Sequence, residues 1–491
     1  MSYLGPKGYT IYKECMSADE LKMLKDDLNV KPYMPKSPIQ PPSFPVYREN
    51  AAKIYIPRYY GSENYGEAHE MKIPKGDDIN VPFIGSLRPD QLHIVDTFAK
   101  SINLGKPNCG GGGLLDIPCG KGKTVDGCKI ISVCGKKTLV IVHKEFLLNQ
   151  WIERISQFLP TARVGKIQGQ IIDIENKDIV IGMLQSLSMK KYPDDMFNSF
   201  GLTIVDECHH ISSEVFSRSL QKIITLYTLG LSATMQRKDG LTKVFKMFLG
   251  DIIYQEKREN DDKVLVKGIH YISNDADFNK VEYDYRGNPA FSTMISKLCA
   301  YNRRSEFIIK VLQKELTLKT GQQVMILAHN RCLLTYLYDA IKHRDIGSVG
   351  YYVGGMKEVA LKKTELCQVV IATYSMAAEA LDIKTLTTLI LATPKTDIVQ
   401  AVGRILRIKH ERPLVIDIID SHDLFASQWL KRRKYYISNK YKVIHTTSGL
   451  YESDTWTTLY EPGEKANEYK KKMKKADDKA EMKGKCLIMG T

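Results

Sequence analysis

The residues with the clearest chemical potential form one short run from Leu115 to Thr124 (LDIPCGKGKT). An apolar stretch gives way to Gly120 and Gly122, and then Lys123 and Thr124 stand before a helix-compatible segment. Glycine-rich loops turn backbone N–H groups toward anionic oxygens, and the N-terminus of the following helix adds its dipole. The run therefore predicts a phosphate-binding loop, with the Lys123 ammonium at the β- and γ-phosphates of a nucleotide and the Thr124 hydroxyl on Mg²⁺.

The loop departs from the common pattern G-x-x-x-x-G-K-[ST] at its first position, where Ile117 stands in place of glycine. Cys119, Gly120 and Lys121 fill the rest of the loop, and we expect them to lie against the phosphates as well. Lys121 is a second cation, two residues before Lys123. On the loop alone, a structural glycine turn before a buried helix explains these residues equally well.

Two adjacent carboxylates follow an apolar run later in the chain. The run Leu202–Val205 predicts a strand, and Asp206 and Glu207 stand at its C-terminal end, before Cys208 and His209. In open α/β sheets, this edge of the sheet binds ligands. Asp206 could hold Mg²⁺, directly or through water, while Glu207 orients or deprotonates the water that attacks a γ-phosphate. An acidic cap on a following helix is the structural alternative for both residues.

The next expected strand, over 227–231, also ends in polar residues. Ser232, Ala233 and Thr234 follow it directly. The two hydroxyls could hydrogen-bond His209 or His210 and couple the nucleotide site to a moving partner. The tripeptide carries little information by itself, and its position after a strand is what supports this role.

Upstream of the loop, Arg88 and Gln91 stand at the start of another helix-compatible segment (LRPDQ). A glutamine amide can pair with the edge of adenine, and an arginine suits the phosphates. We therefore expect Arg88 and Gln91 to bind the nucleotide, although five residues have little specificity alone.

The second half of the chain carries an arginine-rich run at helical spacing. Gln400, Arg404 and Arg407 recur at intervals of four and three residues, which predicts one face of a helix. Arginine stabilises charge on a transferring phosphoryl group, because it stays protonated and presents a planar fork. A basic, solvated helix face is the alternative. Earlier in this half, Asp382 could reach the nucleotide, and Thr373 could contact a phosphate backbone.

Short β-branched runs alternate with helical segments on both sides of a more polar interval over 257–298. Such alternation predicts parallel sheets covered by helices on both faces. Between two of the runs, Trp151, Ile155 and Phe158 share one helical face. Two tandem α/β units are the simplest account. The expected strands span 138–142, 178–181, 202–205, 227–231, 324–328, 369–373, 388–392 and 414–418.

The two ends of the chain differ from these units. The stretch from Ser17 to Leu28 predicts a helix in which Ser17 and Glu20 form a capping box, and a proline-rich run over 31–45 follows. Short strands are expected over 44–48 and 53–60. We therefore expect an N-terminal accessory region (1–80), a first α/β domain (81–256), a linker (257–298), a second α/β domain (299–430) and a C-terminal extension with a lysine-rich, helix-prone tail (431–491).

The composition narrows the class of protein. A net charge of +15 and a pI near 9.1 favour a polyanionic partner, with nucleic acid as the default. Ten scattered cysteines, without a C-x-x-C pair, argue against a zinc module and a disulfide scaffold and for reduced thiols. No signal layout or membrane-spanning run stands in the sequence, so we expect a soluble intracellular protein.

Together these motifs resemble those of superfamily 2 (DExH-type) helicases. The resemblance covers about residues 87–419, in the family's order, and is nearest to the TFIIH-type repair and transcription translocases and the late-transcription helicases of large DNA viruses. Ala380 stands where the family often has glycine. The residues that carry the resemblance are Gln91, Gly122–Thr124, Asp206–His209, Ser232–Thr234, Asp382 and Gln400–Arg407.

The resemblance implies an α/β fold with two tandem RecA-like domains, with ATP and Mg²⁺ bound in the cleft between them. It further implies movement on, or unwinding of, nucleic acid, with DNA ahead of RNA, in transcription, replication or repair. The implied partners are the transcription or repair machinery, in the cytoplasm, the nucleus or a virion. Two alternatives stay open: a nucleic-acid-gated ATPase switch that remodels a transcription complex without separating strands, and a degenerate binding module. A metabolic P-loop kinase would explain the loop but not the arginine-rich run.

Overall fold

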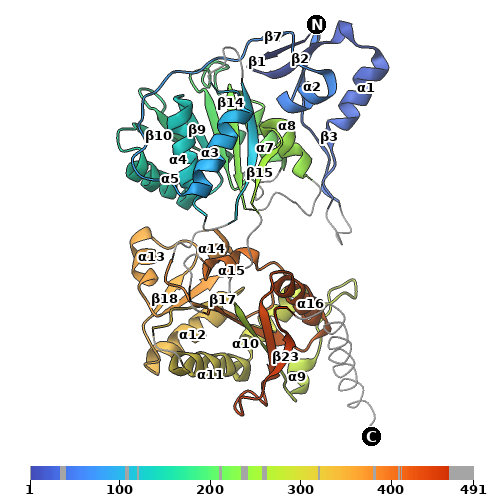
Figure 1. Ribbon diagram of the computed structural model, residues 1–491. Helices are drawn as coiled ribbons and strands as arrows, with labels where there is room; N and C mark the ends of the chain where they lie inside the picture. Colours follow the sequence, from blue (N-terminus) through green and yellow to red (C-terminus); the bar gives the residue numbers. More distant parts are fainter. Residues whose placement is uncertain are drawn as a thin grey trace. The chain divides into compact units, whose positions relative to one another are not determined.

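The computed structural model describes residues 2–33, 40–104, 110–118, 121–208, 213–233, 241–256, 263–318, 321–379, 383–406, 410 and 412–463. The chain divides into two compact units, residues 1–258 and 259–491 (Figure 1). Each unit is built on an eight-stranded sheet, and each is described by itself below.

The first unit begins with a five-stranded sheet in the order β5-β6-β2-β1-β7. The predicted capping box is confirmed, because the Ser17 hydroxyl accepts from the backbone of Glu20 at the start of α1 (Ala18–Asp27). The strand expected over 53–60 ends early, at Ile56. Pro57 has no N–H to continue the ladder, and α2 (Arg58–Tyr65) begins after it. The strands are β1 (Ser2–Gly5), β2 (Gly8–Tyr12), β5 (Arg48–Glu49), β6 (Lys53–Ile56) and β7 (Glu70–Met71), with a separate pair β3 (Asn29–Val30) and β4 (Phe44–Pro45).

The large sheet of the first unit has the order β11-β10-β12-β9-β13-β14-β8-β15 and is parallel except at the β10–β11 hairpin. Every residue of β9, β13 and β14 is buried, as expected for parallel strands covered on both faces. The strands are β8 (Gly111–Asp116), β9 (Thr138–Val142), β10 (Val164–Gln168), β11 (Ile171–Ile172), β12 (Ile179–Met183), β13 (Leu202–Asp206), β14 (Tyr227–Ser232) and β15 (Ile252–Gln255).

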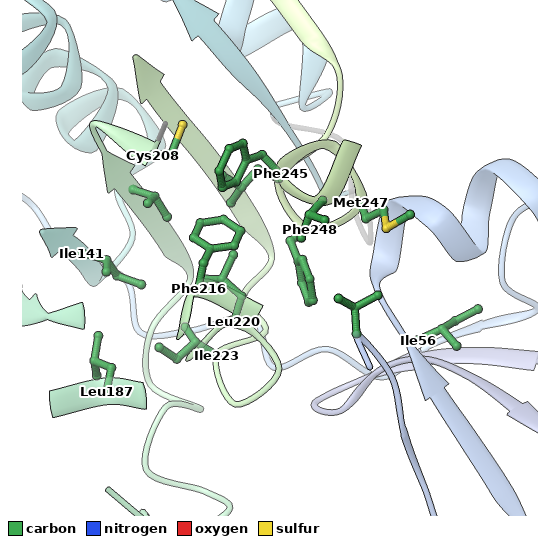
Figure 2. Packing of buried hydrophobic residues seen from close by; sticks show 14 of the residues in the cluster. Ile56, Ile141, Leu187, Cys208, Phe216, Leu220, Ile223, Phe245, Met247 and Phe248 are labelled. Atoms are coloured by element: carbon green, nitrogen blue, oxygen red, sulfur yellow. The ribbon is translucent and has the colours of Figure 1, made fainter. Parts of the chain in front are cut away.

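Helices cover both faces of this sheet. Buried residues of α3 (Pro89–Ser101), α4 (Lys123–Cys134) and α5 (Glu145–Phe158) form one core cluster with the sheet. The other face carries α6 (Leu184–Met189), α7 (Ser213–Leu220) and α8 (Thr242–Leu249). Figure 2 shows this second cluster, where the Phe216 ring meets Phe245 edge-on at 4.8 Å and Ile56 and Met247 belong to the same core. The N-terminal sheet therefore shares a continuous core with the first large sheet.

The second unit has the order β18-β19-β17-β20-β21-β16-β22-β23, parallel except at β22–β23. The interval 257–298, expected to be a linker, instead contributes β16, which lies between β21 and β22. Lys267 and His270 are the polar residues of this strand, and five of the seven residues in β16 are buried. The strands are β16 (Leu265–Tyr271), β17 (Val324–Ala328), β18 (Val349–Tyr352), β19 (Val369–Thr373), β20 (Thr388–Leu391), β21 (Leu414–Asp420), β22 (Lys442–Thr447) and β23 (Thr457–Tyr460).

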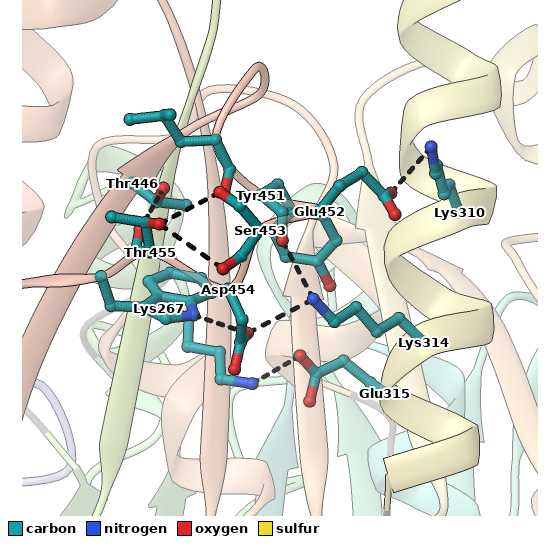
Figure 3. Close-up of polar contacts among 12 residues, drawn as sticks. Lys267, Lys310, Lys314, Glu315, Thr446, Tyr451, Glu452, Ser453, Asp454 and Thr455 are labelled. Carbon is teal, nitrogen blue, oxygen red and sulfur yellow. Dashed lines mark hydrogen bonds and ion pairs between the residues drawn. The ribbon is translucent and has the colours of Figure 1, made fainter.

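The residues after 430 also fold as part of this unit, up to residue 463. Helix α16 (Asp423–Ser438) crosses the expected boundary, and β22 and β23 extend the sheet. Figure 3 shows how the segment between β22 and β23 is fixed: Lys314 Nζ donates to the Tyr451 carbonyl (2.9 Å) and to Asp454 (3.3 Å). The lysine-rich tail after residue 463 lies outside the described residues. The other helices are α9 (Ala276–Asn279), α10 (Phe291–Ala300), α11 (Asn302–Leu318), α12 (Arg331–His343), α13 (Glu358–Glu365), α14 (Tyr374–Glu379) and α15 (Val399–Arg404).

Candidate active site

Three neighbouring strands of the first unit deliver the predicted site residues to one edge of the sheet. Strands β13, β14 and β8 are adjacent and parallel. At their C-terminal ends lie Asp206, Ser232 and the loop that leads into α4. This is the sheet edge at which α/β proteins bind ligands. Side chains that follow these strands contact one another directly.

The loop turns into α4 at Gly122, which adopts a left-handed conformation (φ 84°). A side chain would be strained there, and a Cβ would also lie 2.9 Å from Gln91 Nε2. Lys123 is the first residue of the helix and is almost fully buried. Its Nζ donates to Glu207 Oε1 at 2.8 Å, so the predicted phosphate-binding lysine and the predicted base lie in direct contact. Thr124 follows in the first helical turn.

Glu207 has an unusual backbone conformation for its residue type. Its φ is +48°, in the left-handed region that residues with a Cβ rarely adopt. The Asp206 carboxylate accepts the Glu207 backbone N–H at 2.9 Å. Such strain persists only where the surroundings impose it, and it is frequent at active sites. The strained residue is the one predicted to activate the attacking water.

Asp206 is buried and is fixed by Trp151. The indole Nε1 of Trp151 donates to Asp206 Oδ2 at 2.8 Å, and a Cβ on Gly127 would lie 2.6 Å from the Trp151 ring. Burial, reinforced by the neighbouring Glu207, raises the pKa of Asp206 to about 6. The sequence placed Trp151 correctly on an apolar helix face but missed this polar role. A buried indole N–H usually finds an acceptor, and that was the available signal.

Gln91 and Arg88 lie beside the loop. The Gln91 amide is buried: Oε1 accepts the Arg88 backbone N–H (3.3 Å), and Nε2 donates to Asp126 Oδ1 (2.7 Å). The Arg88 guanidinium pairs with Asp90 and donates to the Lys121 carbonyl at 2.7 Å. Burial raises the pKa of Asp126 to about 7. The stretch LRPDQ is thus attached to the C-terminal end of the phosphate loop and to the first turns of α4.

The two unusual residues of the loop have separate roles. Ile117, which replaces the first glycine, is fully buried, and its N–H donates to the Ser232 carbonyl at 2.9 Å. It therefore continues the core beyond the end of β8. The Lys121 ammonium pairs with Glu256 at 2.6 Å, just after β15. Lys121 and Lys123 are consequently held by different carboxylates.

The oxygen donors of this site are compatible with Mg²⁺. The described part of the chain contains no group of three or more His, Cys, Asp and Glu residues suited to a metal ion. Magnesium in nucleotide sites usually takes one or two protein oxygens and completes its shell with phosphates and water. The Thr124 hydroxyl and the Asp206 carboxylate are donors of that kind.

In the second unit, the predicted arginine face is shorter than expected. Helix α15 ends at Arg404, so the described helix does not extend to Arg407. Arg404 is buried, and its Nε donates to the Ala377 carbonyl of α14 at 2.7 Å, which excludes a solvated face for this residue. Gln400 lies half-buried on the same helix. The predicted site residues outside the described part of the chain are Cys119, Gly120, His209, Thr234, Asp382 and Arg407.

The sequence interpretation missed polar residues at the same edge of the first sheet. His143 and Lys144 follow β9, and Gln185 follows β12, with Gln185 Nε2 donating to the His143 carbonyl at 3.2 Å. Burial lowers the pKa of Lys144. In the second sheet, His329 follows β17 and its ring contacts Thr393 at 2.8 Å. A polar residue within two positions of the end of a mostly apolar strand was the signal for each of them.

Known proteins resemble this chain, one of them over most of its length. Residues 84–237 match the family described as type III restriction enzyme, res subunit. A protein of Acanthamoeba polyphaga mimivirus, provisionally named ATP-dependent RNA helicase L396, is 36% identical over 450 residues, which cover 89% of this chain and 85% of that protein. The DNA 3'-5' translocase XPB2 of Sulfurisphaera tokodaii is 33% identical over 202 residues, 41% of this chain and 44% of the translocase.

A solved structure supports the fold. S. cerevisiae Dbp5 bound to RNA and ADP BeF3 aligns with a TM-score of 0.50 and covers 75% of this chain and 96% of its own. At 13% identity this similarity concerns the fold alone. Within the described residues, no helix combines the length and the apolar character needed to cross a bilayer.

Proposed function

Because this chain belongs to the superfamily 2 helicases, we propose that Lys123, Asp206 and Glu207 form the centre at which it hydrolyses ATP. One observation carries the assignment: Lys123 Nζ and Glu207 Oε1 lie 2.8 Å apart, although 84 residues separate them in the sequence. The pair lies at the C-terminal edge of the sheet, where such folds bind ligands.

The residues have distinct tasks in the proposed reaction. The Lys123 ammonium stabilises negative charge on the β- and γ-phosphates, and it leaves Glu207 as it binds them. Glu207 then orients the attacking water and accepts its proton. Thr124 and Asp206 would hold Mg²⁺, which neutralises charge on the phosphates. Trp151 keeps the Asp206 carboxylate in place through its indole N–H.

For the second unit, we propose that Arg404, Arg407, Gln400 and Asp382 contribute to ATP hydrolysis, as the family resemblance implies. Arg407→Ala should leave nucleotide binding nearly intact and slow hydrolysis by about 10³-fold, the effect of an arginine that stabilises transferring phosphoryl charge. Unchanged hydrolysis in that variant would remove Arg407 from the mechanism.

We propose DNA, rather than RNA, as the nucleic acid that stimulates the enzyme. The net charge of +15 suits either polymer. The archaeal relative is named a DNA translocase, whereas the mimivirus relative is named an RNA helicase. His143, Lys144 and Gln185 are candidates for contact with the backbone, because they occupy the part of the sheet edge beside the hydrolytic centre.

The test is ATP turnover with single-stranded DNA, double-stranded DNA and RNA, with Lys123→Ala as the inactive control. Stimulation by DNA above that by RNA is the expected result, and the reverse order would overturn the choice of DNA. Strand displacement measured on the same samples separates a helicase from an ATPase that moves or remodels without separating strands.

A further inference from the structure

Asp126 lies at the nucleotide site but has no part in the proposed hydrolysis. It stands one turn after Lys123 on α4 and is completely buried. Its Oδ1 accepts from Gln91 Nε2 at 2.7 Å, and Oδ2 has no hydrogen-bond partner within the described ranges. A buried carboxyl group with one oxygen unsatisfied is costly. A role that depends on the contact between Asp126 and Gln91 would explain why a carboxyl group is buried at this position.

The two neighbours of the Gln91 amide fix its orientation. A backbone N–H can only donate, so Arg88 N must face the amide oxygen, as it does at 3.3 Å. The ionised carboxylate of Asp126 can only accept, so above the raised pKa of Asp126 the amide nitrogen must face Oδ1. The Arg88 contact is the longer of the two, which makes Asp126 the stronger constraint. If the amide were reversed, its NH₂ group would face the Arg88 backbone N–H, donor against donor. Its oxygen would face Asp126 Oδ1, acceptor against acceptor.

An amide held this way still has one lone pair on its oxygen and one N–H to offer a ligand. Adenine presents an N6 donor beside the N7 acceptor, and a glutamine amide can bind both together. Guanine presents O6 and N7, which are both acceptors, so its O6 would meet the amide oxygen. A fixed amide therefore favours adenine over guanine.

We propose that Asp126 is the positioning residue that gives this enzyme its preference for ATP over GTP, by holding the Gln91 amide in one orientation. This inference rests on the proposed function, because it requires the base of the bound nucleotide to lie at Gln91. Gly122 supports the arrangement, since a side chain there would collide with Gln91 Nε2.

The test is the ratio of kcat/KM for ATP to that for GTP in the full-length chain. Asp126→Asn keeps the shape of the side chain, but its amide can turn either an oxygen or a nitrogen toward Gln91. We expect the unmodified protein to prefer ATP and the variant to lose about tenfold or more of that preference. The loss should appear as a raised KM for ATP and a lowered KM for GTP.

A matched control removes a buried carboxylate elsewhere in the same unit. Asp178 lies before β12, at the opposite edge of the sheet, and pairs with Arg163 at 2.7 Å. Asp178→Asn should leave the ATP-to-GTP ratio unchanged. A second control is Gln91→Ala combined with Asp126→Asn: once Gln91 is gone, the Asp126 substitution should no longer change the ratio.

The outcomes separate this inference from the proposed function. Active Lys123→Ala protein would overturn the hydrolytic centre itself. Inactive Lys123→Ala protein, together with an unchanged ratio in Asp126→Asn, would overturn only the role of Asp126. The role of Asp126 would also be overturned if the unmodified protein showed no preference for ATP. The same holds if Asp126→Asn still changed the ratio in a protein that lacks Gln91.

Discussion

Both units carry carboxylates on their parallel strands or directly after them, but the contacts of these carboxylates differ. In the first unit, Glu207 adopts a left-handed conformation and meets one lysine at a single oxygen. In the second unit, Asp417 and Asp420 of β21 are buried, and each binds an arginine through both oxygens. Arg432 holds Asp417 at 2.7 and 2.8 Å, and Arg304 holds Asp420 at 2.6 and 2.8 Å.

We interpret the difference as that between a pair proposed to act in ATP hydrolysis and two pairs that stabilise the fold. The planar fork of arginine satisfies a carboxylate in two places, whereas lysine is a point charge that a phosphate can attract away. Both arginines also donate to the segment after β20, to the Ala392 and Lys395 carbonyls at 2.8 Å. The ion pairs of the second unit therefore fix a loop, and the pair of the first unit is suited to exchange its partner.

Loss of the lysine should give the largest effect. In Lys123→Ala, ATP hydrolysis should fall by about 10³-fold, because the variant lacks the ammonium proposed to stabilise charge on the transferring phosphate. Steady-state turnover with saturating nucleic acid measures it.

Lys121→Ala is the matched control for that prediction. Lys121 belongs to the same loop but is paired with Glu256, so its loss should cost much less. A silent Lys121→Ala protein beside an active Lys123→Ala protein would reverse the assignment of the two lysines.

In the second unit, breaking an ion pair should cost stability rather than chemistry. Arg432→Met leaves Asp417 buried without its cation and should lower the free energy of unfolding of this unit by about 3–5 kcal/mol. Denaturant unfolding followed by hydrogen exchange of β21 measures it. Lys431→Met, at an exposed neighbouring position, should change little. Equal effects of the two substitutions would contradict a structural role for the pair.

Each unit has a buried tryptophan whose replacement tests whether it serves hydrolysis or stability. Trp151→Phe removes the donor to Asp206 and should lower kcat about tenfold, the scale of one hydrogen bond to a charged group. Trp429→Phe alters a buried ring of the second unit that packs against His270, so it should affect stability only. The turnover number and the melting temperature, measured for both variants, distinguish an effect on hydrolysis from an effect on stability. If Trp151→Phe lowers only the melting temperature, Trp151 does not position Asp206.

The second unit should also be sensitive to acid. Burial lowers the pKa of His270 to about 4, and His445 and Arg433 add to the shift. An unfolded histidine has a pKa of about 6.5, so the unfolded chain binds more protons between these values and stability falls as pH falls.

We expect the free energy of unfolding of the second unit to fall by about 2 kcal/mol between pH 6.5 and pH 4. His270→Phe should flatten this slope, whereas His343→Gln, at an exposed position, should leave it unchanged. Denaturation at several pH values measures both, and an unaltered slope in His270→Phe would exclude His270 as its source.

The sequence predicted local features well. Strands β9, β17 and β19 begin and end at the residues expected from the sequence, and the fold of two RecA-like units is confirmed. The phosphate loop and the carboxylates of β13 were found because their residues lie together in sequence. Their individual roles remain predictions.

What the sequence did not predict depends on contacts between distant residues. Trp151 and Asp206 are 55 residues apart, and Gln91 and Asp126 are 35 apart, so only the packed sheet brings them together. Strand β16 was missed because Lys267 pairs with Glu315 at 2.6 Å inside the fold, and a paired lysine has the same sequence signature as an exposed one. The left-handed conformation of Glu207 has no local sequence signal either.

The most direct test of the contrast is single-turnover hydrolysis by Glu207→Gln, with nucleotide binding measured on the same protein. The amide keeps the size of the side chain but cannot accept the proton of the attacking water. We predict ATP binding close to that of the unmodified protein and hydrolysis slower by about 10²–10⁴-fold, the usual contribution of a general base. Hydrolysis at the unmodified rate would contradict the account, because Glu207 would then be a structural carboxylate like those of the second unit.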